Sequence, residues 1–277
     1  MFWKGWGFEM GIYKYNGAGN DFILLPDFGV SLADDVLPAL AVHYCDRSGA
    51  YGADGMMVLR KSAIADCRML FFNSDGSKAE MCGNGARCLC RFCYEQGISG
   101  ETQVIETPAG IVTGQRLSED QYRIRLNSPT VSRIHRDGSY VELGDPGIPH
   151  LVLPRPEQLD RSALRDYARK WRFDLRLPRG ANVNLYRLVG ENCLELLTYE
   201  RGVEDFTLAC GTGTGATVYA LTALGLVTGA NTEVRNEGGT LYVDVLREDT
   251  DVALYLTGPA VEEQLPPTNA SQAQRIP

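Results

Sequence analysis

Two cysteines in closely similar surroundings are the residues of this chain best suited to chemistry. Cys82 lies in "EMCGNGARC" (80–88) and Cys210 in "LACGTGTGA" (208–216), each within a Cys-Gly-x-Gly element. A helix pattern follows each cysteine, and a helix N-terminus favours the thiolate while its N–H groups can bind an anion. Two such thiols on opposite sides of one carbon could remove a proton from one face and return one to the other, which inverts a stereocentre.

A repeat with a fixed offset relates the two cysteines. They lie 210 − 82 = 128 residues apart, and six of the 14 glycines in residues 11–127 fall on another glycine at this offset. Chance predicts about 1.5 matches, and a fixed period is the signature of duplicated structural units. A single Cys-Gly-x-Gly is more often structural than functional, but the matched pair favours function. The matched glycines are Gly19 with Gly147, Gly52 with Gly180, Gly83 with Gly211, Gly85 with Gly213, Gly97 with Gly225 and Gly110 with Gly238.

The repeat predicts two copies of one α/β unit. Residues 11–127 form the N-terminal repeat, which we expect a C-terminal strand near 252–263 to complete, and residues 128–251 form the C-terminal repeat. Apolar runs predict matching strands in the two halves, among them 67–73 and 194–200, and the helices 86–97 and 214–225 follow the cysteines. Gly97 and Gly225 are predicted to end these helices.

Composition excludes several classes of protein. The formal net charge of -8 and a pI near 5.0 argue against a nucleic-acid partner. No apolar run is long enough to span a membrane. The eight cysteines, without a secretion signal, indicate reduced thiols and a cytoplasmic protein. Residues 1–10 are interpreted as an extension, and residues 266–277 are polar and expected to be disordered.

Six motifs, in order along the chain, identify a family. "GAGNDF" (17–22), "GADG" (52–55), "NSDGSKAEMCGNGARC" (73–88), "ANVN" (181–184), "YERGVED" (199–205) and "ACGTG" (209–213) resemble the motifs of the diaminopimelate epimerases, which are cofactor-independent amino-acid racemases. The resemblance covers residues 13–258. It implies two pseudo-symmetric α/β domains, each with strands curled round a central helix, and an amino-acid substrate between them.

The resemblance also implies the site residues. Cys82 and Cys210 would be the acid and base. Around the reacting amino-acid head it implies Asn20, Gly83, Asn84, Gly211 and Thr212. Further substrate contacts would come from Asn73, Asn182, Glu200 and Arg201, and Arg201 is suited to a bidentate bond with a distal carboxylate.

One departure from the family pattern bears on the substrate. The family has Gly-Asn-Pro-His where this chain has "GIPH" (147–150), so Ile148 replaces an asparagine that contacts the distal part of the substrate. An isoleucine side chain forms no hydrogen bond. We therefore count Ile148 among the substrate-binding positions and expect it to affect the choice of substrate.

No metal and no cofactor are expected. Cys88, Cys90 and Cys93 in "CLCRFC" lack a second ligand cluster or a nearby histidine, so they are interpreted as core residues. The dinucleotide and Walker fingerprints are absent. Nothing supports a pyridoxal site.

The predicted function is stereoinversion at the α-carbon of an amino acid, with conversion of LL- to meso-diaminopimelate in lysine and peptidoglycan biosynthesis as the leading form. The partner is then a small amino acid, with a homodimer as a candidate assembly and no role for nucleic acid or membrane. Three alternatives stay open. They are a racemase for another amino acid such as histidine, an isomerase of the phenazine-biosynthesis type, and a binding protein without catalysis.

Overall fold

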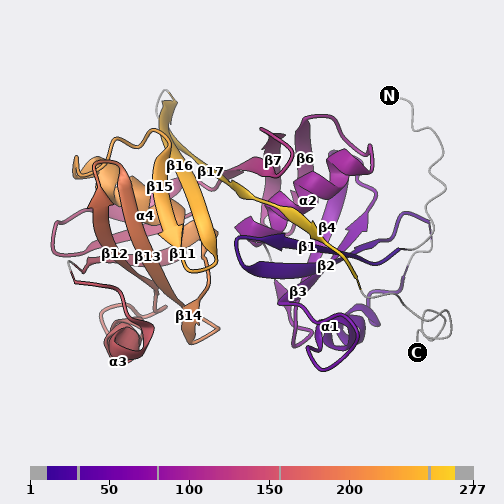
Figure 1. Ribbon diagram of the computed structural model, residues 1–277, viewed down its shortest axis with the longest axis horizontal. Helices are drawn as coiled ribbons and strands as arrows, with labels where there is room; N and C mark the ends of the chain where they lie inside the picture. The colour runs from indigo at the N-terminus through magenta and orange to yellow at the C-terminus, as the bar shows by residue number, and fades with distance from the viewer. Residues whose placement is uncertain (1–10, 30–31, 80, 156, 249–250, 266–277) are drawn as a thin grey trace. The chain divides into compact units, whose positions relative to one another are not determined.

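The computed structural model describes residues 11–29, 32–79, 81–155, 157–248 and 251–265. The predicted extension 1–10 and the predicted disordered tail 266–277 lie outside these residues. The chain divides into two compact units (Figure 1). Unit 1 comprises Met1–Thr113 and Ala260–Pro277, and unit 2 comprises Gly114–Pro259.

Unit 1 is a mixed sheet with two helices. Its strands are β1 (Tyr13–Gly17), β2 (Asn20–Pro26), β3 (Gly55–Arg60), β4 (Cys67–Asn73), β5 (Lys78–Ala79), β6 (Thr102–Thr107), the first part of β7 (Gly110–Arg116), and β18 (Val261–Glu263). Its helices are α1 (Leu37–Cys45) and α2 (Gly83–Glu95). The strand pair β2–β3 is parallel, whereas β1 pairs antiparallel with both β2 and β18.

Unit 2 repeats this plan. Its strands are β8 (Gln121–Leu126), β9 (Pro129–Arg133), β10 (Ser139–Leu143), β11 (Ile148–Pro154), β12 (Asn182–Gly190), β13 (Cys193–Glu200), β14 (Asp205–Thr207), β15 (Thr232–Asn236), β16 (Gly239–Glu248) and β17 (Asp251–Pro259). Its helices are α3 (Arg161–Arg172) and α4 (Gly211–Ala223). The parallel pair is here β11–β12.

The order of elements places a cysteine in the same crossover of each unit. Parallel strands need a crossover connection, usually a helix. In unit 1, α1 joins β2 to β3, and α2 lies between β4 and its parallel partner β6. In unit 2, α3 joins β11 to β12, and α4 lies between β13 and its parallel partner β15. The helices α2 and α4 are therefore the equivalent elements, as the repeat predicts.

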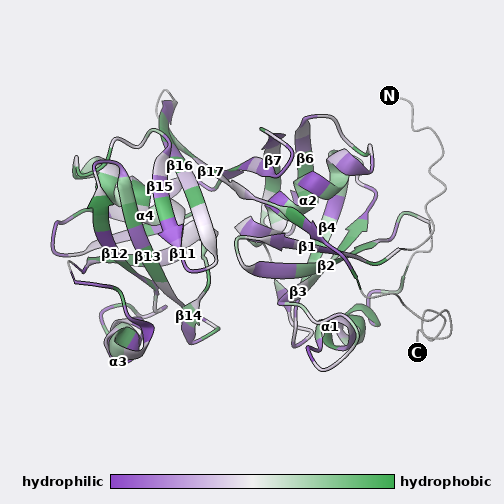
Figure 2. Cartoon of the chain, viewed as in Figure 1, coloured by the Kyte–Doolittle hydropathy of each residue, from purple (hydrophilic) through white to green (hydrophobic). Residues whose placement is uncertain are grey.

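These two helices lie in the interior of their units. Every residue of α2 from Gly83 to Cys93 is buried, and it packs against β1, β2, β6 and β18. The helix α4 packs against β10, β11, β12, β16 and β17. A helix that is buried on all sides is the core of its unit, which fixes its N-terminus relative to the surrounding strands. Stretches of hydrophobic residues along β12 and β13 are visible in unit 2 (Figure 2).

The structure confirms the predicted fold class, and its division into compact units does not coincide with the predicted repeats, whose bounds stay a prediction. The predicted N-terminal repeat ended at residue 127, whereas unit 1 ends at Thr113. The cause is β8, which pairs along its length with β17 and so joins unit 2. Of the predicted closing strand near 252–263, only β18 pairs within unit 1, where Lys14 lies opposite Glu263.

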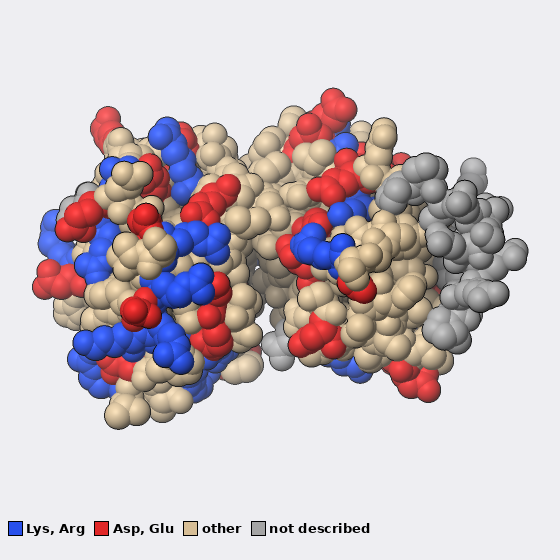
Figure 3. All heavy atoms as spheres, turned by 60° about the horizontal axis from the view of Figure 1, so that its bottom comes forward, with Lys and Arg blue, Asp and Glu red and all other residues tan. Residues whose placement is uncertain are grey.

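Basic residues gather on the surface of unit 2. The helix α3 carries Arg169, Lys170 and Arg172 in its last turn. Blue side chains cover much of the unit 2 surface in Figure 3, in which the side carrying α3 comes forward. Several of these cations are paired, as Arg165 is with Asp205 at 2.9 Å. Arg165, Arg169, Lys170 and Arg172 all belong to α3, so a single segment of the chain supplies these cations.

Candidate active site

Both cysteines lie at the predicted place, the N-terminus of a central helix. Cys82 is the N-cap of α2 and Cys210 the N-cap of α4, each with extended backbone before the first helical residue. The Cys210 Sγ accepts a hydrogen bond from Gly213 N at 3.4 Å, and the Thr212 hydroxyl lies 3.6 Å from the same sulfur. The backbone N–H of Gly213 in the first turn of α4 is thus directed at the Cys210 thiol. This arrangement stabilises negative charge on the sulfur.

The second glycine of each Cys-Gly-x-Gly element, Gly85 or Gly213, permits close packing at the helix N-terminus. A Cβ at Gly213 would lie 2.3 Å from Asn184 Oδ1 and 3.3 Å from Cys210 Sγ, so a larger residue would displace the thiol's surroundings. At Gly85, the repeat mate of Gly213, the nearest atom to a Cβ would be Met57 Sδ at 3.2 Å. The requirement for glycine is therefore stricter in unit 2.

In unit 1 the structure brings Asn20 and Asn84 together. Asn84 Nδ2 donates to Asn20 Oδ1 at 2.6 Å, and Asn20 Nδ2 donates to Asp54 Oδ2 at 3.0 Å. Asn84 lies in the first turn of α2 directly after Gly83, so its bond to Asn20 ties β2 to the start of the helix that Cys82 caps. Asn73 is different, because its Nδ2 donates to the Ser77 hydroxyl at 2.9 Å within a tight turn.

In unit 2 the structure brings Asn182 and Arg201 together. Asn182 Oδ1 accepts the backbone N–H of Arg201 at 2.8 Å, and Asn182 is buried at the start of β12. Arg201 is exposed at the end of β13, and its Nη1 donates to the Arg179 carbonyl at 3.3 Å. The Arg179 side chain in turn pairs with Glu142 at 2.5 Å. No sequence motif marks Arg179, so it is not among the predicted site residues.

Glu200 lies beside the Cys210 thiol. Its Oε1 accepts from the Thr207 hydroxyl at 2.5 Å, and a second side-chain hydrogen bond joins it to Cys210. Burial raises the pKa of the Glu200 carboxyl, although the two hydrogen bonds act in the opposite direction. A carboxyl group of this kind can hold a proton next to the sulfur.

The strand β11 begins at Ile148 and carries His150 two residues later. Ile148 is half-buried opposite Leu143 of β10, and the carbonyl of its neighbour Gly147 accepts from Arg179 Nη1 at 3.2 Å. His150 is fully buried, and burial together with the charge of Arg201 lowers its pKa to about 3. His150 is therefore a neutral imidazole near Arg201.

Two residues of the unit 1 site escaped the sequence analysis, Asp54 and Arg87. Asp54 lies in the "GADG" motif and is the repeat mate of Asn182, since 182 − 128 = 54, so the repeat itself could have identified it. Arg87 is fully buried in α2, and its Nη2 donates to Asn84 Oδ1 at 2.9 Å. Cys88, Cys90 and Cys93 are also fully buried in α2, and Cys93 Sγ lies 3.6 Å from Cys67 Sγ.

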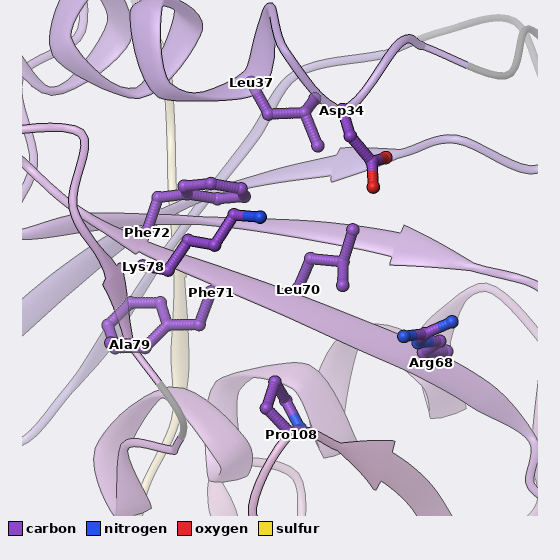
Figure 4. Close-up of a pocket in the computed structure, with 9 residues that line it drawn as sticks. All are labelled: Asp34, Leu37, Arg68, Leu70, Phe71, Phe72, Lys78, Ala79 and Pro108. Carbon is purple, nitrogen blue, oxygen red and sulfur yellow. The ribbon is translucent and has the colours of Figure 1, made fainter.

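Two surface hollows in the units are lined by neither cysteine. One, of about 480 Å³, lies in unit 2 against Asp166, Arg169, Lys170 and Phe173. The other, of about 220 Å³, lies in unit 1, where Lys78, Phe71 and Phe72 are among the lining residues (Figure 4). Neither hollow contains a residue of the predicted site.

The comparison with known families decides the identity of the fold. Residues 12–131 and 144–262 match the family model described as diaminopimelate epimerase. The chain belongs to the diaminopimelate epimerase family. The diaminopimelate epimerase of Archaeoglobus fulgidus is 36% identical over 265 residues, which cover 89% of this chain and 92% of that protein. That of Aquifex aeolicus is 35% identical over 271 residues, covering 90% and 94%.

Solved structures of other proteins share the fold. A phenazine biosynthesis protein of the PhzF family from Bacillus anthracis superposes with a TM-score of 0.70 at 14% identity, covering 92% of this chain and 97% of that one. A hydroxyproline epimerase from Agrobacterium vitis gives 0.64 at 14% identity, covering 92% and 91%. The predicted family resemblance and the two-domain α/β fold are thus confirmed, and the family is one of isomerases. Within the described residues, no helix is long and apolar enough to cross a membrane.

Proposed function

We propose that this member of the diaminopimelate epimerase family inverts the α-carbon of diaminopimelate, converting the LL to the meso isomer, and that Cys82 and Cys210 are its base and acid. The observation that carries the proposal is the matched placement of the two thiols at the N-termini of the equivalent buried helices α2 and α4. The relatives named as diaminopimelate epimerases support the choice of substrate.

The proposed chemistry needs only protein groups. One sulfur, as thiolate, takes the α-proton and becomes a thiol, and the electron pair of the broken C–H bond passes into the substrate carboxylate as an enolate-like charge. The other thiol gives its proton to the opposite face of the same carbon and becomes the thiolate. Helix N–H groups stabilise the charge that develops on the carboxylate. No cofactor takes part in this proposal.

The remaining residues have distinct proposed tasks. Asn20, Asn84, Gly83, Gly211 and Thr212 surround the reacting head, and Glu200 holds a proton at Cys210. Asn182 and Arg201 bind the distal carboxylate, because a guanidinium makes two parallel bonds to such a group. We place Asn73 and Ile148 at the distal end of the substrate. The product serves lysine and peptidoglycan synthesis, and we propose the cytoplasm as the place of action.

Ile148 favours one alternative, a racemase for another amino acid such as histidine. Its side chain offers apolar contact where the family has a hydrogen-bonding asparagine. Arg201 argues against this alternative, because it suits a second carboxylate in the substrate.

A deuterium experiment tests the proposed function. The protein is incubated in heavy water with LL-diaminopimelate, histidine and glutamate in separate reactions. The isomers are separated, and the deuterium content of each is measured by mass spectrometry. We expect meso-diaminopimelate with one solvent deuterium at the inverted carbon, and little deuterium in the substrate recovered early. Exchange with histidine alone would favour the alternative, and no exchange with any of the three would contradict both.

A further inference from the structure

A row of hydrogen bonds in unit 1 links a buried arginine to a carboxylate through two amides. Arg87 Nη2 donates to Asn84 Oδ1 at 2.9 Å, and Asn84 Nδ2 donates to Asn20 Oδ1 at 2.6 Å. Asn20 Nδ2 then donates to Asp54 Oδ2 at 3.0 Å. We call Arg87, Asn84, Asn20 and Asp54 the amide relay.

The two ends of the relay determine its direction. A guanidinium only donates hydrogen bonds and a carboxylate only accepts them, whereas an amide group can be turned so that its oxygen and nitrogen exchange places. If the Asn84 amide were turned, its nitrogen would face Arg87 and its oxygen would face Asn20 Oδ1. If the Asn20 amide were turned, its oxygen would face Asp54. Both amides therefore have one allowed orientation.

Both ends of the relay are themselves held in place. Asp54 Oδ1 accepts from Arg47 Nη2 at 2.6 Å, and Asp54 Oδ2 also accepts the backbone N–H of Asp21 at 3.3 Å. Arg87 is fully buried, and its Nη1 lies 3.4 Å from the Gly83 carbonyl in the first turn of α2. Burying a guanidinium is unfavourable, and burial lowers the Arg87 pKa. Negative charge on the neighbouring thiols, first Cys88 and then Cys82 and Cys90, would act in the opposite direction and favour the charged arginine.

The repeat shows that the fold does not need the relay. At the offset of 128, the relay residues map in chain order to Ile148, Asn182, Thr212 and Gly215 of unit 2. A Cβ at Gly215, the mate of Arg87, would lie 2.5 Å from Leu126 Cδ1, so this place has no room for a side chain. Unit 2 builds the same helix in the same crossover without any of these bonds. The relay therefore serves something other than the shared framework.

We propose that Arg87 and Asp54 are positioning residues, which act through Asn84 and Asn20 to fix how these two amides meet the head group of the amino-acid substrate. The inference rests on the proposed function, in which Asn20 and Asn84 surround this head group. In the relay Asn20 uses one of its two N–H groups on Asp54 and keeps the other for an acceptor such as the substrate carboxylate. Turning the amide would put an oxygen in the place of this donor.

Reversing the relay is the test, and it needs two exchanges of similar shape. With Asn84→Asp alone, a carboxylate oxygen faces Asn20 Oδ1, and we expect the unfolding midpoint to fall by roughly 5 °C. Adding Asp54→Asn lets Asn20 turn, donate to the carboxylate at 84 and accept from the amide at 54. The double variant should recover part of the lost stability, and not all of it, because the amide nitrogen at 54 then also faces the Asp21 N–H. Its KM should stay at least about tenfold above wild type, with kcat falling less than KM rises.

The single variant Asn84→Asp is the control for charge, because it and the double variant carry the same carboxylate next to Cys82. Additive losses of stability in the double variant would show that the amides have no preferred direction and would overturn the inference. Recovery of KM together with stability would show that the relay is only structural, which also overturns it. The stability measurements need no substrate. An inactive wild-type protein would therefore contradict the proposed function, while the thermal data would still decide the direction of the relay.

Discussion

The Asn182 side chain fixes the backbone of Arg201 across the strand pair β12–β13, through a 2.8 Å hydrogen bond from the Arg201 N–H to Asn182 Oδ1. Asn182 is only 6% exposed, whereas Arg201 is exposed. A buried amide thus sets the point at which an exposed guanidinium leaves the sheet. Because Arg201 Nη1 also donates to the Arg179 carbonyl, the direction of the side chain is set as well.

Arg201→Lys should therefore weaken binding of the distal carboxylate. A lysine keeps the charge but loses the planar pair of donors. We expect the KM for diaminopimelate to rise by about tenfold or more, with a smaller change in kcat. Arg187→Lys is the matched control, because Arg187 also gives two N–H groups to one carboxylate, that of Glu195, and lies outside the proposed site. An equal effect of both substitutions would argue against a substrate contact at Arg201.

Cys82→Ala and Cys210→Ala should each abolish most epimerase activity. The two thiols form one catalytic unit, so either loss should lower kcat by roughly three orders of magnitude or more. The measurement is circular dichroism of diaminopimelate isomers over time. Cys193→Ala, at the half-buried start of β13, is the control and should keep wild-type activity. Near-normal turnover in either of the first two variants would rule out the two-thiol mechanism.

Ile148→Asn should change recognition of the substrate and leave the chemistry intact. The new amide supplies one hydrogen bond, worth about 0.5–1.5 kcal/mol for neutral partners. KM for diaminopimelate should then fall several-fold with little change in kcat. If the protein prefers another amino acid, the same substitution should weaken that activity. Values of kcat/KM for diaminopimelate, histidine and glutamate decide the matter, and no change in any of them would place residue 148 outside the substrate pocket.

Gly213→Ala should be far more damaging than Gly85→Ala, although the two glycines are repeat mates. The new methyl at 213 would lie 2.3 Å from Asn184 Oδ1, which is buried, whereas the one at 85 would meet the flexible Met57 side chain at 3.2 Å. We expect a loss of about 2 kcal/mol or more at 213 and less than about 1 kcal/mol at 85. Urea unfolding measures both. Equal losses would mean that the surroundings of Cys210 are not packed as described.

Replacing His150 should make the protein less sensitive to acid. Its pKa is lowered to about 3 in the folded protein, so between pH 6.5 and 3 the unfolded chain binds a proton that the folded protein does not. The free energy of unfolding therefore has its full contribution from the neutral His150 above pH 6.5, and this contribution is lost as the pH falls from 6.5 toward 3. His150→Phe, which introduces the residue type found at the repeat mate Phe22, should remove this loss.

The size of this effect is measurable by urea unfolding at pH 7 and pH 5.5. The wild-type protein should lose about 1 kcal/mol more than His150→Phe over this interval. His135→Phe, at an exposed histidine, is the control and should keep the wild-type dependence. Identical losses in wild type and His150→Phe would mean that His150 accepts its proton in the folded state as easily as in the unfolded chain.

The sequence by itself determined the duplication and the place of the two cysteines. Glycines at a constant offset mark backbone positions that other residues tolerate badly, and Gly52 with Gly180 and Gly97 with Gly225 do have positive φ in both units. Local patterns also located β4, β13 and the helices after the cysteines, because apolar runs and caps act over a few residues. Cys82 and Cys210 follow from the repeat together with this local information.

Only the tertiary structure decided which distant residues act together. The repeat predicts a boundary at residue 127, whereas the compact unit 1 ends at Thr113 because β8 pairs with β17, and strand pairing over more than 100 residues leaves no local signal. The bonds from Arg87 through Asn84 and Asn20 to Asp54 join three separate segments of the chain. The direction of these bonds depends on the Arg87 guanidinium and the Asp54 carboxylate lying at opposite ends of the same two amides. Only the folded unit brings these groups together.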